Sequence, residues 1–174
     1  MEPLLEQPTR RRIFEVVRAH PGSSAREIQR LAGLGWGETA YHLDQLTRAG
    51  LLRRERGGHR DFYFPGPMTW EERRILQALR RPAPRRILVA LVDRPDRTLA
   101  EIASAAGLSL STASFHLRHL LAASVVEGHP DGNLRRYRAA QPERVRKLLQ
   151  EYRTSLSDSW VDRFVEAWSG LLEG

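Results

Sequence analysis

Apolar side chains recur every three or four positions in three consecutive stretches near the start of the chain, which is the spacing of one face of a helix. The first stretch, residues 11–19, stops at the sequence HPG. The second, residues 24–33, starts with a serine three positions before a glutamate, which is the spacing of a capping box, and stops at a glycine. The third places three residues on one buried face: Thr39, Leu43 and Leu46. Short apolar runs on either side of Gly57-Gly58 then predict a β-hairpin.

The same pattern occurs a second time, 74 positions further along, and the two copies align without a gap. The second copy predicts helices over 85–92 and 98–107, a third helix capped by Ser109, and a hairpin that turns at Asp131-Gly132-Asn133. Helix, helix, sharp turn, helix and hairpin is the order of a winged helix-turn-helix. We therefore predict a mainly α fold with small β-hairpin wings (α+β), built from two tandem winged helix-turn-helix domains and a C-terminal helical segment.

The repeat also predicts the domain boundaries. We expect a first winged-helix domain in residues 1–66, a helical linker in 67–82, a second winged-helix domain in 83–140, and one C-terminal helix or two shorter ones in 141–174. The linker should be a helix over 69–80 because Thr69 and Glu72 have capping-box spacing. Four residues are expected on its apolar face: Trp70, Ile75, Leu76 and Leu79. Such a helix would pack on a domain and hold the two copies at a fixed separation.

An apolar stripe runs through the C-terminal segment and is too extensive for a solvated tail. The stripe can dock back onto the tandem domains or pair with a second copy of the protein. The second possibility predicts a homodimer with contacts from six residues: Leu149, Tyr152, Leu156, Trp160, Phe164 and Trp168.

Composition narrows the class of partner. A net charge of +7 and a pI near 10.8 favour a polyanion, and nucleic acid is a common one. The chain has no cysteine, which excludes disulfides, thiolate metal sites and cysteine nucleophiles. The histidines are scattered and no catalytic motif stands out, so we predict no enzyme activity, no metal and no cofactor. No stretch approaches the roughly 18 apolar residues of a membrane span, and the first residues lack the pattern of a signal peptide. We expect a cytoplasmic, nucleoid-associated protein without membrane contact.

Residues 108–139, LSLSTASFHLRHLLAASVVEGHPDGNLRRYRA, resemble the ArsR-like winged-helix regulators. The shared features are a Ser/Thr-rich helix start, a His-Leu pair followed by a second Leu, a small-residue turn, and a D-G hairpin that ends in a tyrosine. Residues 38–64, ETAYHLDQLTRAGLLRRERGGHRDFYF, look like a related regulator domain of an archaeal type. The resemblance implies a third helix that reads the major groove, a wing on phosphate or the minor groove, and dimerisation through terminal helices. Metal-sensing relatives use cysteines, so metal sensing is not implied here.

Candidate DNA contacts follow from the resemblance and the repeat. In the second copy they are Ser111, Thr112, Ser114, Phe115, Arg118, His119, Arg135, Arg136 and Arg138. In the first copy they are Tyr41, Gln45, Arg53, Arg54, Arg56 and Arg60. Hydroxyl groups suit phosphate oxygens, and an arginine such as Arg118 suits guanine O6 and N7. Because the third helix of the first copy carries Glu38 and Asp44, we predict that the second copy reads bases and the first contributes mainly through its wing. The alternative is that the two helices are equivalent.

The leading hypothesis is a sequence-specific, double-stranded DNA-binding transcriptional regulator. Two other functions stay open. One is an architectural, chromatin-like protein that binds duplex DNA with little sequence preference. The other is a protein-interaction module whose wings contact other proteins. Salt separates them, because phosphate contacts weaken steeply as salt rises and an apolar interface does not.

Overall fold

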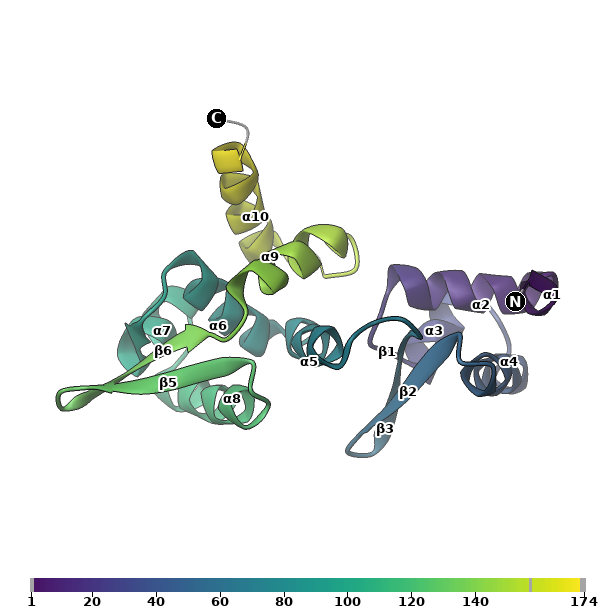
Figure 1. Cartoon of the computed structure of the whole chain (residues 1–174), viewed down its shortest axis with the longest axis horizontal. Coiled ribbons are helices and arrows are strands. Elements are labelled where there is room, and N and C mark those ends of the chain that lie inside the picture. Colours follow the sequence, from purple (N-terminus) through teal and green to yellow (C-terminus); the bar gives the residue numbers. More distant parts are fainter. Residues whose placement is uncertain (1, 157, 173–174) are drawn as a thin grey trace. The chain divides into compact units, whose positions relative to one another are not determined.

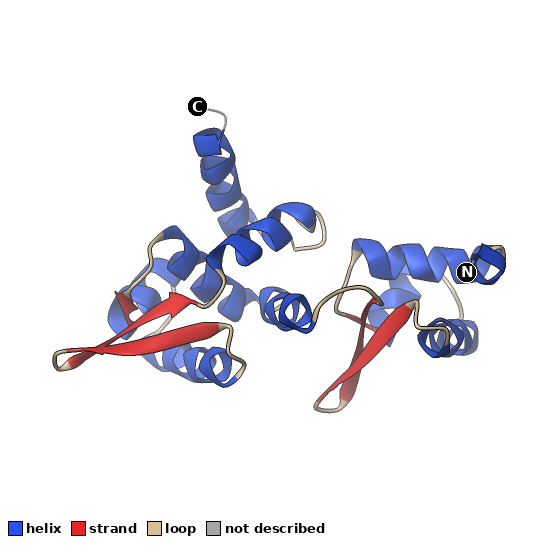
Figure 2. Cartoon of the chain, viewed as in Figure 1, coloured by secondary structure: helices blue, strands red, loops and turns tan. Residues whose placement is uncertain are grey.

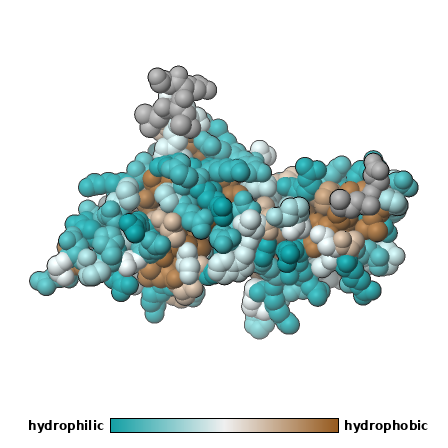
Figure 3. All heavy atoms as spheres, viewed as in Figure 1, coloured by the Kyte–Doolittle hydropathy of each residue, from teal (hydrophilic) through white to brown (hydrophobic). Residues whose placement is uncertain are grey.

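The computed structural model describes residues 2–156 and 158–172, with side chains described for all of these except residues 2, 159–161, 171 and 172. The chain divides into two compact units, Met1–Arg73 and Arg74–Gly174 (Figure 1). Each unit combines helices with one three-stranded antiparallel sheet (Figure 2). Hydrophilic residues cover most of the face of each unit that is visible in Figure 3.

The first unit is built around three helices and a hairpin. Its elements are α1 (Glu2–Leu5), α2 (Pro8–Ala19), β1 (Ser23–Ser24), α3 (Ala25–Ala32), α4 (Trp36–Arg48), β2 (Leu52–Gly57) and β3 (Arg60–Pro65). Helices α2, α3 and α4 pack on one another, with Ile13, Ile28 and Leu46 fully buried between them. Strands β2 and β3 pair in register from Leu52 opposite Pro65 to Gly57 opposite Arg60. This hairpin, residues 52–65, is the first wing.

The second unit repeats this order and adds helices. Its elements are the greater part of α5 (Trp70–Leu79), then α6 (Pro82–Asp93), β4 (Arg97–Thr98), α7 (Leu99–Ala106), α8 (Leu110–Ala122), β5 (Val126–Asp131), β6 (Leu134–Ala139), α9 (Pro142–Glu151) and α10 (Ser159–Leu172). Helix α6 is its centre, because residues 87–92 are all buried and α7, α8, α9 and α10 all pack against α6. The second wing is the hairpin of β5 and β6, residues 126–139.

The helix ends predicted from the repeat are confirmed. Gly33 and Gly107 end α3 and α7 with φ of 64° and 63°, a left-handed conformation that glycine adopts without strain. Ser24 and Thr98 each accept a hydrogen bond from the backbone N–H three residues on, at 3.3 Å. In the second copy the carboxylate of Glu101 also accepts from the Thr98 N–H at 2.7 Å, which completes the capping box.

The sequence did not predict the third strand of either sheet. The two-residue strand β1 pairs with β3, with Ser23 opposite Tyr63. Strand β4 pairs with β6 in the same way, with Arg97 opposite Tyr137. These strands connect each hairpin to the segment just before α3 or α7, so the wing has a fixed base.

The linker helix forms as predicted, with one correction. Thr69 and Glu72 make both hydrogen bonds of a capping box, and Ile75, Leu76 and Leu79 are buried. Trp70, which we expected on the same face, is 53% exposed. The reason is helical geometry, since at about 100° per residue Trp70 points roughly opposite to the average direction of the other three side chains.

The C-terminal segment forms two helices, and its apolar stripe packs inside the second unit. Of the residues expected at a dimer interface, Leu149, Leu156 and Trp168 are only 1%, 2% and 7% exposed. Tyr152 and Phe164 are half-buried, and the side chain of Trp160 lies outside the described residues. These buried side chains show that the C-terminal segment docks onto its own chain. Homodimerisation stays a prediction.

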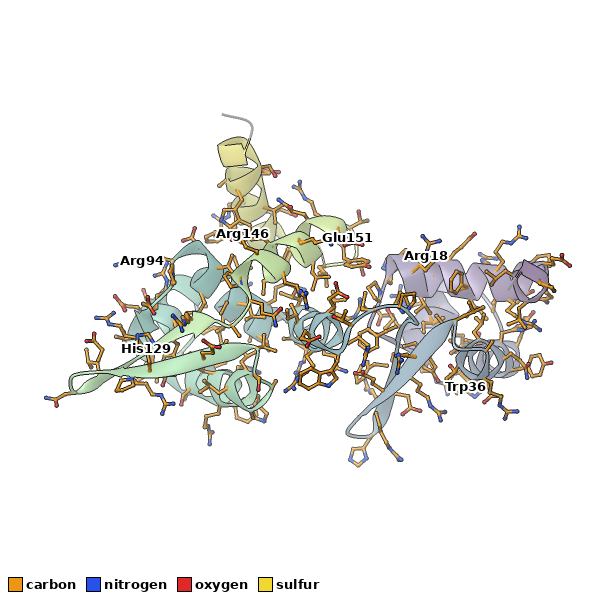
Figure 4. All side chains as sticks on the ribbon, viewed as in Figure 1. Arg18, Trp36, Arg94, His129, Arg146 and Glu151 are labelled. Atoms are coloured by element: carbon orange, nitrogen blue, oxygen red, sulfur yellow. The ribbon has the colours of Figure 1, made fainter. Side chains whose placement is uncertain are left out.

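Arginine side chains hold this segment in place. The guanidinium of Arg146 on α9 lies 5.6 Å from the centre of the Trp168 ring on α10 (Figure 4). Asp158, just before α10, accepts a hydrogen bond at 3.2 Å from Arg85 of α6, whose side chain is only 9% exposed. A buried arginine left without its carboxylate would be strongly destabilising, so this ion pair holds the residue that precedes α10 against α6.

Candidate nucleic-acid interface

Helices α4 and α8 each present one exposed stripe opposite their buried face. In α8, Ala113, Leu117 and Leu120 are buried, which turns the opposite side to solvent. The exposed stripe of α8 consists of Ser111, Phe115, Arg118 and Ala122, and that of α4 of Gly37, Tyr41, Asp44 and Arg48. Each member of one stripe is 74 positions from its counterpart in the other. We call these the outer stripes.

The outer stripe of α8 has the chemistry of a groove-reading surface. Arg118 is exposed and, among the residues that the structure describes, it has no acidic partner within 4.0 Å. In α4 the counterpart of Arg118 is Asp44, which pairs with Arg48 at 2.9 Å. The guanidinium of Arg118 is therefore available to a ligand, whereas the charges on the α4 stripe partly neutralise each other.

The hydroxyl groups at the start of α8 differ in their surroundings, since some form the helix cap and others are exposed. Ser109 accepts from the Thr112 N–H at 3.2 Å, and its hydroxyl donates to Thr112 Oγ1 at 2.8 Å. Thr112 and Ser114 are half-buried, whereas Ser111 is exposed on the outer stripe. Of the three predicted hydroxyl contacts, Ser111 is thus the one presented most openly to a ligand.

In the first unit a groove of about 800 Å³ lies between α3, α4 and the first wing. Its lining includes four arginines and two large aromatic rings: Arg26, Arg48, Arg54, Arg60, Trp36 and Tyr63. The two acids of the lining, Asp44 and Asp61, pair with Arg48 and Arg54. The Arg26 guanidinium lies 4.1 Å from the centre of the Trp36 ring, a cation–π contact that holds both side chains at the start of α4 (Figure 4). Arg26, Trp36 and Arg48 were not among the predicted contacts. The 74-position alignment could have indicated Trp36, because its counterpart Leu110 is also a large exposed apolar residue at the first position of its helix.

The counterparts of these groove residues in the second unit are small or apolar. Arg26 corresponds to Ala100, Arg48 to Ala122 and Arg60 to Leu134, which is 56% exposed. The first unit therefore gathers arginines around its groove, whereas the second unit has Arg118 at the stripe position that Asp44 occupies in the first.

The two wings differ in how their arginines are engaged. In the first wing, Arg53 donates to the Gly66 carbonyl at 3.4 Å and Arg54 lies 3.9 Å from Asp61. Arg56 and Arg60 are exposed, and no acidic group in the described part of the chain lies within 4.0 Å of either. Their charge is available to a ligand.

In the second wing two of the three predicted arginines are committed to acids. Arg136 donates to Asp131 at 2.5 Å and to the Asp96 carbonyl at 2.9 Å, and it also lies 3.5 Å from Glu101. The hydrogen bond from Arg136 lowers the pKa of Asp131 and the same bond raises the pKa of Arg136. Arg138 pairs with Glu127 at 3.2 Å.

The third arginine of the second wing, Arg135, is exposed and contacts the Tyr137 ring at 6.0 Å. Arg136 and Arg138 thus brace the wing, and of the three arginines Arg135 is the one without an acidic partner among the described residues.

The remaining predicted residues lie beside the outer stripes. Gln45 and His119 occupy equivalent positions, half-buried on α4 and exposed on α8. His42 is 6% exposed and accepts from Arg10 Nε–H at 3.4 Å. Burial, reinforced by the Arg10 charge, lowers the pKa of His42, and burial with the Arg81 and His119 charges lowers the pKa of His116. Both are packing residues of the helices, and within the described residues no three His, Asp or Glu side chains are grouped as a metal site requires.

Comparisons with known proteins match these two units. Residues 7–76 match a family model described as an N-terminal HTH domain, and residues 81–129 match one described as a helix-turn-helix domain. An uncharacterized HTH-type transcriptional regulator of Methanocaldococcus jannaschii is 26% identical over 132 residues, which cover 76% of this chain and 33% of that protein. The chain thus corresponds to about a third of the length of this relative. In the part of the chain that the structure describes, no helix is long and apolar enough to cross a membrane.

Proposed function

We propose that this tandem winged helix-turn-helix protein is a transcriptional regulator that binds double-stranded DNA with sequence preference. The observation that carries the proposal is the outer stripe of α8, where Ser111 and Arg118 are exposed without an acidic neighbour on the helix. B-DNA's major groove admits an α-helix, and an arginine on that helix can bond guanine O6 and N7 together. We place the protein in the cytoplasm, on nucleoid DNA.

The two units have different roles in DNA binding. The second unit reads bases through α8, with Arg135 on the backbone or in the minor groove. The first unit binds mainly phosphate, because its free cations Arg56 and Arg60 are on the wing and its α4 stripe carries Asp44. Phosphate contacts fix position and base contacts specify sequence, so a chain with one unit of each kind can do both.

Binding of the full chain to a labelled duplex, titrated with salt, tests the DNA-binding part of the proposal. Affinity should fall by a factor of about eight for every phosphate contact per tenfold rise in salt, since the log–log slope is about −0.9 per phosphate neutralised. A protein-interaction module would show no measurable duplex affinity. An architectural protein would show the slope but bind all duplexes equally, so competition between unrelated duplexes separates it from a regulator.

A further inference from the structure

The outer stripes of both recognition helices carry an aromatic residue at the same repeat position. Tyr41 on α4 and Phe115 on α8 are 74 positions apart and are 56% and 49% exposed. A single exposed apolar residue needs no explanation. An exposed ring at the equivalent point of two diverged copies, in the centre of the stripe that faces outward, has the position of a ligand contact.

Each ring is held in place by the histidine that follows it. The ring centres of Tyr41 and His42 are 5.1 Å apart in an edge-on arrangement, and those of Phe115 and His116 have the same separation and arrangement. The Phe115 ring also lies 4.5 Å from His119, whose Nδ1–H donates to the Phe115 carbonyl at 2.8 Å. A ring restrained in this way loses little conformational freedom when a ligand covers it.

The neighbours of Phe115 limit what can cover it. On the same stripe Phe115 lies between Ser111 and Arg118, and His119 lies beside it, so hydrogen-bonding groups flank the ring. A protein partner would need a wider apolar patch. In the major groove the apolar group that base edges offer is the C5 methyl of thymine, next to hydrogen-bonding atoms that suit the flanking polar residues.

We propose that Phe115 is a specificity-determining residue that contacts the C5 methyl of thymine, and that Tyr41 has the equivalent position in the first unit. The inference rests on the proposed function, because it assigns a base to the same helix. The preferred ligand is then a duplex with a thymine that contacts Phe115 and an adjacent guanine that contacts Arg118.

The test uses the full chain and the duplex it binds most tightly, with each thymine replaced in turn by uracil. Uracil lacks only the methyl group, so pairing and hydrogen-bonding atoms are unchanged. One buried methyl group is worth about 0.8 kcal/mol, so uracil in place of one particular thymine should lower the affinity about fourfold. A second thymine position should show the same loss if Tyr41 also contacts a methyl group. In Phe115→Ala the fourfold effect at the first of these thymines should vanish, and in Phe115→Leu most of it should remain.

Leu134→Ala is the matched control, because Leu134 is an equally exposed apolar residue of the same unit, on the wing rather than on α8. This variant should keep the full effect of uracil. The inference is overturned if the natural chain discriminates between sequences but tolerates uracil everywhere, or if Phe115→Ala is as sensitive to uracil as the natural chain. If no duplex is preferred over any other, the proposed sequence preference fails, and the inference with it.

Discussion

Removal of the two free cations of the first wing should flatten the salt dependence of DNA binding. Arg56 and Arg60 are exposed and have no acidic partner in the described structure, so each is expected to neutralise one phosphate. The double variant Arg56→Ala/Arg60→Ala should lose about 1.8 from the magnitude of the log–log slope, at about 0.9 for each contact. Between 50 and 200 mM salt, a fourfold change, the natural chain should therefore lose about twelvefold more affinity than the variant.

The assay is fluorescence anisotropy of a labelled duplex at several salt concentrations, with one control for charge and one for folding. Lys147→Ala/Arg163→Ala removes the same net charge from exposed positions of the C-terminal helices and should leave the slope unchanged. Exposed substitutions of this kind alter the free energy of unfolding by about 0.5 kcal/mol or less, so a matching thermal midpoint confirms the fold. Equal slopes in the natural chain and the wing variant would refute the reasoning. Equal flattening in the wing variant and the control would show that net charge acts and the wing does not.

Three further predictions concern the recognition helices and the C-terminal segment. Arg118→Ala should weaken binding to the preferred sequence by roughly 1–3 kcal/mol and leave binding to unrelated duplexes nearly unchanged in competition assays, and an equal loss on all sequences would make Arg118 a phosphate contact. Leu149→Ala should lower the free energy of unfolding by roughly 2–5 kcal/mol in urea denaturation, because the side chain is 1% exposed. A halved mass in sedimentation with unchanged stability would instead assign Leu149 to a dimer interface. Because the pKa values of His42 and His116 are lowered, the folded state disfavours their protonation, so stability should be complete above about pH 6.5 and fall as the pH drops below it. Replacement of both histidines by glutamine should reduce that fall between pH 7 and pH 5, and an identical pH profile would contradict the assignment.

The sequence predicted features that depend on neighbouring residues in the chain. Helix starts at Ser24 and Thr98 and helix ends at Gly33 and Gly107 follow from local hydrogen bonding and backbone conformation, which the residue types dictate. The buried face of α4 follows from spacing alone, because Thr39, Leu43 and Leu46 recur at helical intervals. The two-residue strands β1 and β4 are too short to produce any periodicity, so they were missed.

The candidate site depended on contacts between residues far apart in the chain, and the sequence predicted it less completely. Arg135, Arg136 and Arg138 look equivalent in the sequence. In the structure Arg136 also bonds Asp96, 40 positions away, Arg138 pairs with Glu127, and Arg135 has no acidic partner among the described residues. The groove of the first unit brings Arg26 beside residues of the wing, which no spacing rule relates. An apolar stripe such as that around Leu149 is the same whether its partner is intramolecular or a second chain, so only the structure shows it docked.

A selection of random duplexes by the full chain at about 0.15 M salt, followed by sequencing of the retained pool, tests the central claim most directly. Sequence-specific binding predicts an enriched motif in which a thymine and an adjacent guanine mark the contacts of α8. Retention of duplexes without enrichment would contradict sequence-specific regulation and favour an architectural role. Failure to retain any duplex would contradict DNA binding itself.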